Sequence, residues 1–163
     1  MTHDNLPATA PSSDQLILAC RGLTLDPSGH PLLDAAGELA ELHRDRLAVR
    51  AVHGIDRHRV RLVRAIDSYV RTHTPRPLGH ACAYPETIGA VVDRLAGCCT
   101  VAYATHPMIS ETERRCTEPV AMDLAREVAE LLPAVLSGER VVPVLYVAPR
   151  SATGIMATRC GQS

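Results

Sequence analysis

The segment from residue 85 to 106 constrains the fold of this chain more than any other. Its spacing is helical: at 100° per residue, one side carries Ile, Val, Leu and Cys, while the opposite side is mostly Gly, Ala and Thr. Small side chains let a second helix approach closely, so we expect this helix to be buried on both sides. A helix with neighbours on two sides requires a core built from several helices.

Two helices are predicted before this segment. One runs from Pro31 to about His53, where Gly54 allows a break, and the next runs from there to about His73. Residues 15–25 are predicted to form either a short helix or a strand. The sequence therefore places at least two helices where they can cover the segment 85–106.

A last helix is predicted after it. Ser110 and Glu113 match a capping box, and a further helix start is expected at Thr117. Pro133 should kink this helix, and Gly138 is a suitable residue to follow its end. Residues 141–147 are expected to pair as an edge strand or to pack in an extended form.

The composition agrees with such a bundle. The chain has no Phe or Trp and only four Tyr among 163 residues, so its core must consist of Leu, Val, Ile, Ala, Met and Cys. A chain of this length can bury a core without metal or disulfides. We predict an all-α fold, a single-domain bundle of about four to five helices at 15–147, with a flexible arm at 1–14 and a flexible tail at 148–163.

Charge and motifs exclude several classes of protein. A net charge of −1 argues against nucleic-acid binding, and no apolar run is long enough to span a membrane. We therefore expect a cytoplasmic protein whose six cysteines are mostly reduced. All 17 basic residues are Arg, which excludes Schiff-base chemistry on lysine and the GxxxxGK phosphate loop.

Charged residues stand at positions where apolar ones are expected. Asp93 lies on the small-residue side of the segment 85–106, and Arg59 lies within the apolar stripe of the preceding helix. A buried charge needs a partner, so we predict an ion pair between Arg59 and Asp93, with Arg94 pointing towards the rim. This pair could serve only to tie two helices together.

The helix from Pro31 carries a second anomaly. Its apolar stripe continues at the same phase into Arg46, Arg50 and His53, and His43 lies one step to the side. Inward cations need a counter-charge. It could be Asp56, Asp93 or the acidic last helix, or it could be a bound carboxylate or phosphate, which Arg holds well.

One stretch resembles a known family. The run ETIGAVVDRLA at 86–96 is similar to the ETPG-x-x-x-DRL segment of a bacterial all-helical family catalogued as domain of unknown function 4254. Leu42, His43 and Arg46 resemble an upstream motif of that family, and HRVRLVRAID at 58–67 resembles its next helix. The resemblance covers roughly residues 35–147. It implies a helical fold and marks Asp93 and Arg94, but it implies no particular reaction.

The leading hypothesis is a cofactor-free enzyme acting on a small anionic metabolite, as in the biosynthesis of a specialised metabolite. Lyase, isomerase or cyclase chemistry would suit such a site. The substrate would be bound by Arg46, Arg50, Arg59 and Arg94, with His43 or His53 transferring protons and Asp93 orienting Arg59. We expect a homodimer by default.

Two alternatives stay open. One is a non-catalytic partner protein that uses the Arg-rich face of the helix after Gly54, made of Arg57, Arg61, Arg64 and Arg71. The other is a metal or haem protein, although the spacing of its potential ligands is typical of no known site. Those ligands are His80, Cys82, Cys98, Cys99, His106 and Cys116.

Overall fold

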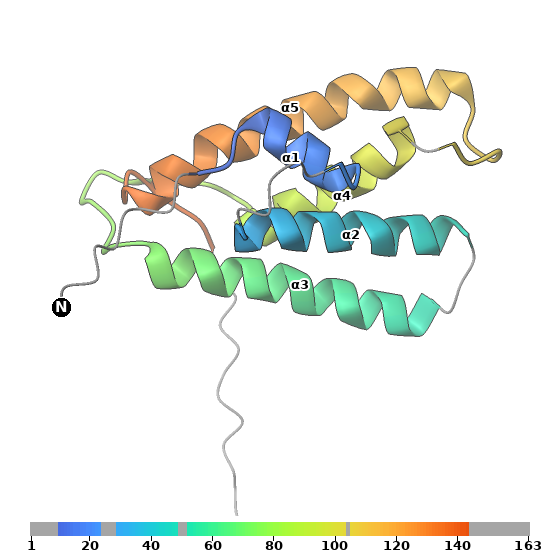
Figure 1. Cartoon of the computed structure of the whole chain (residues 1–163). Coiled ribbons are helices and arrows are strands. Elements are labelled where there is room, and N and C mark those ends of the chain that lie inside the picture. The colour runs from blue at the N-terminus through green and yellow to red at the C-terminus, as the bar shows by residue number, and fades with distance from the viewer. Residues whose placement is uncertain (1–9, 24–28, 49–51, 104, 144–163) are drawn as a thin grey trace, which may run out of the picture.

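Five helices account for most of the residues that the structure describes (Figure 1). The structure is a computed structural model, and it describes residues 10–23, 29–48, 52–103 and 105–143, with the backbone alone at 52 and 53. The helices are α1 (Ser13–Cys20), α2 (Pro31–Leu47), α3 (Val52–His73), α4 (Ile88–Tyr103) and α5 (Glu111–Leu136). The predicted all-α bundle is confirmed.

Helix α4 is the centre of the bundle. In Figure 1 it lies behind α1, with α5 above and α2 and α3 below, and it contacts all four of these helices. Ile88, Val91, Val92 and Leu95 are fully buried. The small-residue side also packs closely, since the Thr100 hydroxyl donates a hydrogen bond of 3.2 Å to the carbonyl oxygen of Ala40 in α2. Burial of this helix on two sides, as predicted, is therefore confirmed.

The boundary between α2 and α3 differs from the prediction. Helix α2 ends at Leu47 rather than near His53, and α3 begins at Val52, so Gly54 lies inside a helix. The φ angle of Gly54 is not positive, and nothing lies within 4 Å of the place where its Cβ would be. Glycine permits a chain break but does not impose one, and this exposed position tolerates it in a helix.

Helix α5 begins as predicted but runs further without interruption. Ser110 is its N-cap and forms the full capping box with Glu113. The predicted second start at Thr117 is wrong, because Pro119 lies within one continuous helix. At the other end, Gly138 adopts a φ of 80°, which is the left-handed conformation expected after a helix.

A short parallel pair of strands lies beside α5. Strand β1 (Cys82–Ala83) pairs with β2 (Arg140–Val141), and Tyr84 donates a hydrogen bond to Glu127 of α5.

The ends of the chain complete the comparison with the prediction. Where a helix or a strand was expected after residue 15, the structure has the helix α1, which begins at Ser13 within the predicted arm. Residues 1–9, 144–147 and the predicted tail at 148–163 lie outside the described residues. Of the described helices, none is long and apolar enough to cross a membrane.

Candidate functional site

The predicted ion pair between Arg59 and Asp93 is confirmed. Arg59 of α3 donates from Nε to Oδ1 at 3.1 Å and from Nη2 to Oδ2 at 2.6 Å, so both carboxylate oxygens of Asp93 in α4 are engaged. The two side chains are 19% and 20% exposed. A two-point arginine–carboxylate pair that excludes most water fixes the relative position of the two helices.

His43 of α2 is the second partner of Asp93. Its Nε2 lies 3.0 Å from Oδ1 and 3.1 Å from the backbone carbonyl oxygen of the same residue. Because both neighbours are acceptors, Nε2 must carry the proton, and in the neutral ring Nδ1 is then an acceptor. Gly97 makes room for this ring: a Cβ there would lie 3.2 Å from His43 Cε1.

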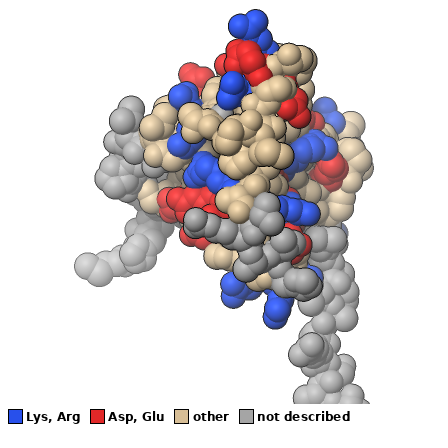
Figure 2. Space-filling view, turned by 90° about the vertical axis from the view of Figure 1, so that its right-hand side faces the viewer, with Lys and Arg blue, Asp and Glu red and all other residues tan. Residues whose placement is uncertain are grey.

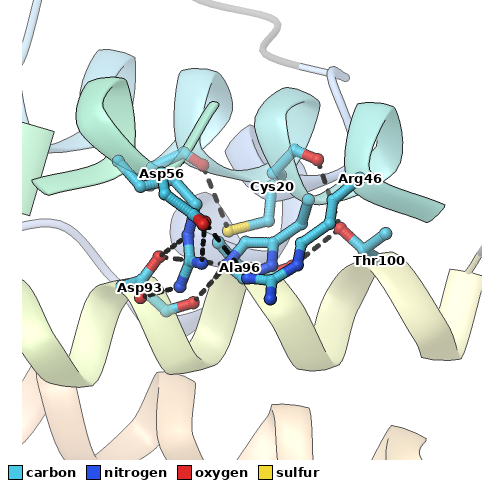
Figure 3. A network of polar contacts seen from close by, with 10 residues as sticks. Cys20, Arg46, Asp56, Asp93, Ala96 and Thr100 are labelled. Atoms are coloured by element: carbon cyan, nitrogen blue, oxygen red, sulfur yellow. Dashed lines mark hydrogen bonds and ion pairs between the residues drawn. The ribbon is translucent and has the colours of Figure 1, made fainter. Parts of the chain in front are cut away.

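The network extends outwards through Asp56 (Figure 3). Arg59 Nη1 and Arg46 Nη1 lie 3.4 Å and 3.2 Å from the same oxygen, Oδ1 of Asp56. Burial alone would raise the pKa of Asp93, but the hydrogen bonds from His43 and Arg59 and the charge of Arg59 lower it to about 2. We call His43, Arg46, Asp56, Arg59 and Asp93 the Asp93 network.

Of the predicted site residues that do not belong to this network, one lies apart from it and two have side chains outside the described part of the chain. Arg94 points to the rim, as expected, and pairs with Glu86 at 2.9 Å. Arg46 is 49% exposed, so the predicted inward cationic stripe is not inward at this position. The physical reason is that α2 ends one residue later. Arg50 and the side chain of His53 are outside what the structure describes.

The Asp93 network is balanced by its own charges. Its two carboxylates match its two guanidinium groups, so the counter-charge expected from a bound anion comes from Asp56 and Asp93 instead. The end of the molecule where α2 leads into α3 carries interspersed basic and acidic side chains over its described part (Figure 2). For Arg46 and Arg59, the geometry favours the alternative in which the ion pairs only tie the helices together. The catalytic roles of His43, His53 and Asp93 stay predictions.

A cavity elsewhere brings together arginines that lack such compensation. It measures about 470 Å³ and lies between the C-terminal half of α3, the loop at 74–77 and residues 135–143. Arg64, Arg71 and Arg140 line it, and none of them forms an ion pair or a hydrogen bond with the described side chains. We call it the α3–β2 cavity.

The remaining wall of the α3–β2 cavity is mostly apolar. Besides Ser68 and Thr74, it is formed by the apolar residues Val70, Pro75, Pro77, Val135, Val141, Val142 and Pro143. Among the described residues that line it, Asp67 is the only acid. The arrangement is therefore an apolar pocket with cationic groups at its edge, which is typical of a site for a ligand with an apolar body and an anionic end.

Asp67, in the wall of this cavity, also binds the N-terminal turn of α4. Its Oδ1 accepts a hydrogen bond of 2.8 Å from the amide of Gly89 in the first turn of α4, while its Oδ2 is buried without a hydrogen bond within reach. Burial raises the pKa of Asp67, and the Gly89 amide and the Thr87 hydroxyl offset only part of this effect. Asp67 is thus both the partner of a helix N-terminus and the titratable group of the cavity wall.

The sequence pattern indicates only two of the three arginines that line this cavity. Arg64 and Arg71 are seven residues apart and so share a helix face, and the sequence places them on the Arg-rich face of the alternative hypothesis. Arg140 joins them only because β2 pairs with β1, which is a contact over more than 50 residues that no periodicity reveals.

Metal ligation was the remaining alternative. Within the described ranges, no group of three or more His, Cys, Asp or Glu side chains is arranged to hold a metal ion. Cys82 and Cys116 are exposed on separate elements, and Cys99 is buried in α4. The six candidate ligands therefore do not converge in the described structure.

Comparisons with known proteins found no similar protein. No family model matches the chain, and neither a curated protein nor a solved structure is similar to it. The resemblance to the bacterial helical family stays a prediction, and the function must be inferred from the geometry.

Proposed function

We propose that this protein binds a small amphipathic anion, a carboxylate or phosphate with an apolar body, in the α3–β2 cavity. The observation that carries the proposal is the group formed by Arg64, Arg71 and Arg140, which line one apolar cavity and are not neutralised by described carboxylates. The proposal keeps the ligand class expected from the sequence and moves the site from the end of α2 to the C-terminal half of α3.

Electrostatics supports this choice of ligand. Three guanidinium groups around one cavity repel one another, and an anion bound between them removes that repulsion while gaining charge-assisted hydrogen bonds. Arginine is suited to this because its planar fork matches carboxylate and phosphate oxygens. The Asp93 network lacks this driving force, since its charges are already paired.

The size and lining of the cavity support an apolar body on the ligand. A volume of about 470 Å³ lies within the range of small-molecule sites, which is roughly 300–1,000 Å³. Contact with Val70, Val135 and Val142 would contribute about 25 cal/mol for each Å² of apolar ligand surface removed from water. Short anions with little or no apolar surface would not gain this contribution to the binding free energy.

Thermal unfolding of the whole chain tests the proposal. Octanoate and phenyl phosphate are the probes, with acetate and inorganic phosphate at the same concentrations as controls. A ligand present at about a hundred times its Kd stabilises the folded state by about 2.7 kcal/mol, which raises the Tm of a chain of this size by roughly 5 °C or more. We expect this rise with the apolar anions and a much smaller rise with the short ones.

Matched variants locate the effect. Arg64→Gln and Arg71→Gln should each remove most of the Tm rise. Arg57→Gln and Arg61→Gln should leave it unchanged, because these arginines lie on the same helix, are also exposed, and do not line the cavity. The proposal is wrong if none of the anions raises Tm, or if all four substitutions reduce the rise equally.

A second function is favoured by one observation. Arg57, Arg61, Arg64 and Arg71 are exposed along α3, and none forms an ion pair with a described residue. Such a row can bind an acidic protein surface, as the alternative from the sequence holds. Equal sensitivity of all four positions, together with salt-dependent association in size-exclusion runs, is the outcome that supports this function instead.

A further inference from the structure

Two cysteines from different helices meet in the bundle. Cys20 is the last residue of α1 and Cys99 lies in α4, and the exposed fractions of the two residues are 1% and 2%. The two side chains border one cavity, and each shifts the pKa of the other's thiol. Cys20 Sγ donates a hydrogen bond of 3.8 Å to the carbonyl oxygen of Ala36, which holds it on the side of α1 that faces the core.

The pair borders a second cavity, separate from the α3–β2 cavity. This thiol cavity measures about 610 Å³ and is lined by both cysteines. The polar residues in its wall are Arg21, Arg44, Thr100, Tyr103, Thr105 and His106. The two cysteines therefore lie at the wall of a space large enough for a small polar molecule, although the residues themselves expose almost no surface.

Positive charge surrounds the thiol cavity. Arg44 Nη1 donates a hydrogen bond of 3.2 Å to the backbone carbonyl oxygen of Cys20, and Arg21 lies over the ring of Tyr103 at 4.6 Å. The guanidinium groups are thus held in the wall of the cavity that both cysteines line. An environment of this kind favours a thiolate over a thiol.

We propose that Cys20 and Cys99 form a redox-active dithiol that reacts with hydrogen peroxide and closes to a disulfide between α1 and α4. The Cys99 thiolate attacks one peroxide oxygen, the O–O bond breaks, and hydroxide leaves and is protonated to water. Cys99 is then a sulfenic acid. The Cys20 sulfur attacks the Cys99 sulfur, the S–O bond breaks, and a second water leaves with the proton of Cys20. The two thiols lose two electrons, and peroxide gains them.

The electrostatics gives each cysteine its part in this sequence. The interaction with the Cys20 thiol lowers the pKa of Cys99, burial opposes this, and the charge of Arg21 lowers it further. The pKa of Cys20 is raised by the interaction with Cys99 and by burial. Cys99 is therefore the nucleophile, and Cys20 keeps its proton until the second step.

The neighbouring residue provides a matched control. Cys98 is half-buried beside Cys99 in α4, but burial raises its pKa and it does not line the thiol cavity. If peroxide oxidised cysteines of this chain without selection, Cys98 and the exposed Cys82 and Cys116 would react at least as readily.

The test uses the full reduced chain, treated with one equivalent of hydrogen peroxide and then with maleimide to count the remaining thiols. We expect two thiols to be lost per chain and the tryptic peptides 1–21 and 95–114 to be found joined by a disulfide. The same peptides should be joined in Cys98→Ser, which assigns the link to Cys99. Cys99→Ser should abolish the loss, and Cys20→Ser should leave a sulfenic acid on Cys99 that dimedone traps.

Helix content by circular dichroism checks that the serine variants fold, and Cys20→Ala and Cys99→Ala replace any that does not. Arg21→Gln should slow the loss of thiols several-fold without changing which cysteines react. The inference is overturned if the wild type keeps all its thiols under one equivalent of peroxide. A link through Cys98, or thiol loss at the wild-type rate in Cys99→Ser or Cys99→Ala, overturns it as well.

Discussion

Asp93 links α2, α3 and α4 through a single carboxylate, so its charge should matter to the stability of the folded state. Its pKa falls from 3.8 to about 2 because the hydrogen bonds from His43 and Arg59 outweigh the effect of burial. A depressed pKa of this kind contributes stability that is present above pH 4 and is lost as the pH falls from about 4 to about 2. The difference corresponds to about 2 kcal/mol.

Asp93→Asn should therefore lower the free energy of unfolding at pH 7 by about 2 kcal/mol, since Arg59 would lose its charged partner. Urea unfolding measured between pH 2 and pH 7 checks both claims. The wild type should lose stability between pH 4 and pH 2 relative to the variant. Asp56→Asn is the control: Asp56 belongs to the same network but is half-exposed, so its change should cost less than about 1 kcal/mol. Equal losses in both variants would contradict the importance of burial.

At the level of single residues, the ion pair between two charged side chains in the core could be predicted from the sequence. Arg59 and Asp93 occupy helix faces that are otherwise apolar or small, and buried charges must be compensated, so their pairing could be predicted from spacing alone. The outward direction of Arg46 could not be predicted, because it depended on how far α2 extends. The proposed site at Arg64 and Arg71 was not predicted, because exposed arginines on a helix face are usually solvated.

The crossing of α3 and α4 depends on one glycine. A Cβ on Gly89 would overlap the backbone carbonyl oxygen of Val63 and lie 2.8 Å from Oδ1 of Asp67. Backbone cannot move aside as a flexible side chain can, so Gly89→Ala must push the two helices apart. We expect a loss of about 2 kcal/mol in the free energy of unfolding, measured by urea denaturation.

Gly54→Ala is the matched control for this prediction. Gly54 also lies in a helix, but nothing is within 4 Å of its missing Cβ. Alanine is favoured over glycine in a helix by about 1 kcal/mol, so this variant should be more stable than the wild type. The close crossing at Gly89 would be refuted if Gly89→Ala were also neutral or stabilising.

The elements themselves were predictable where local signals agree and were misjudged where glycine or proline was taken as a stop. The start of α5 follows from the capping box of Ser110 and Glu113, and Glu111 pairs with Arg114 and Arg115 in the same turns. These local contacts stabilise the first turns, so the helix continues through Pro119. Proline removes one hydrogen bond, which a helix stabilised on both sides of it can tolerate.

Across the whole molecule, α4 is the element on which the other helices depend. The α3–β2 cavity lies by its N-terminal end, where Asp67 meets Gly89, and the thiol cavity borders its C-terminal half at Cys99 and Tyr103. Neither cavity could be predicted from the sequence, because each combines one helix face with residues far away in the chain. Helical periodicity specifies faces, and only the packed bundle specifies which faces meet.

The central position of α4 predicts how the bundle unfolds. Leu95 is fully buried in this helix, and α4 contacts every other helix, so a cavity created there should weaken the whole bundle rather than one part. Leu95→Ala should lower the free energy of unfolding by about 3 kcal/mol. Unfolding in urea followed by circular dichroism at 222 nm and by tyrosine fluorescence should still give coincident transitions. Leu78→Ala in the exposed loop before β1 is the control and should change stability by less than about 0.5 kcal/mol. Helical signal that persists in Leu95→Ala after the tyrosine transition would mean that α5 or the α2–α3 pair holds together without α4, contrary to its central role.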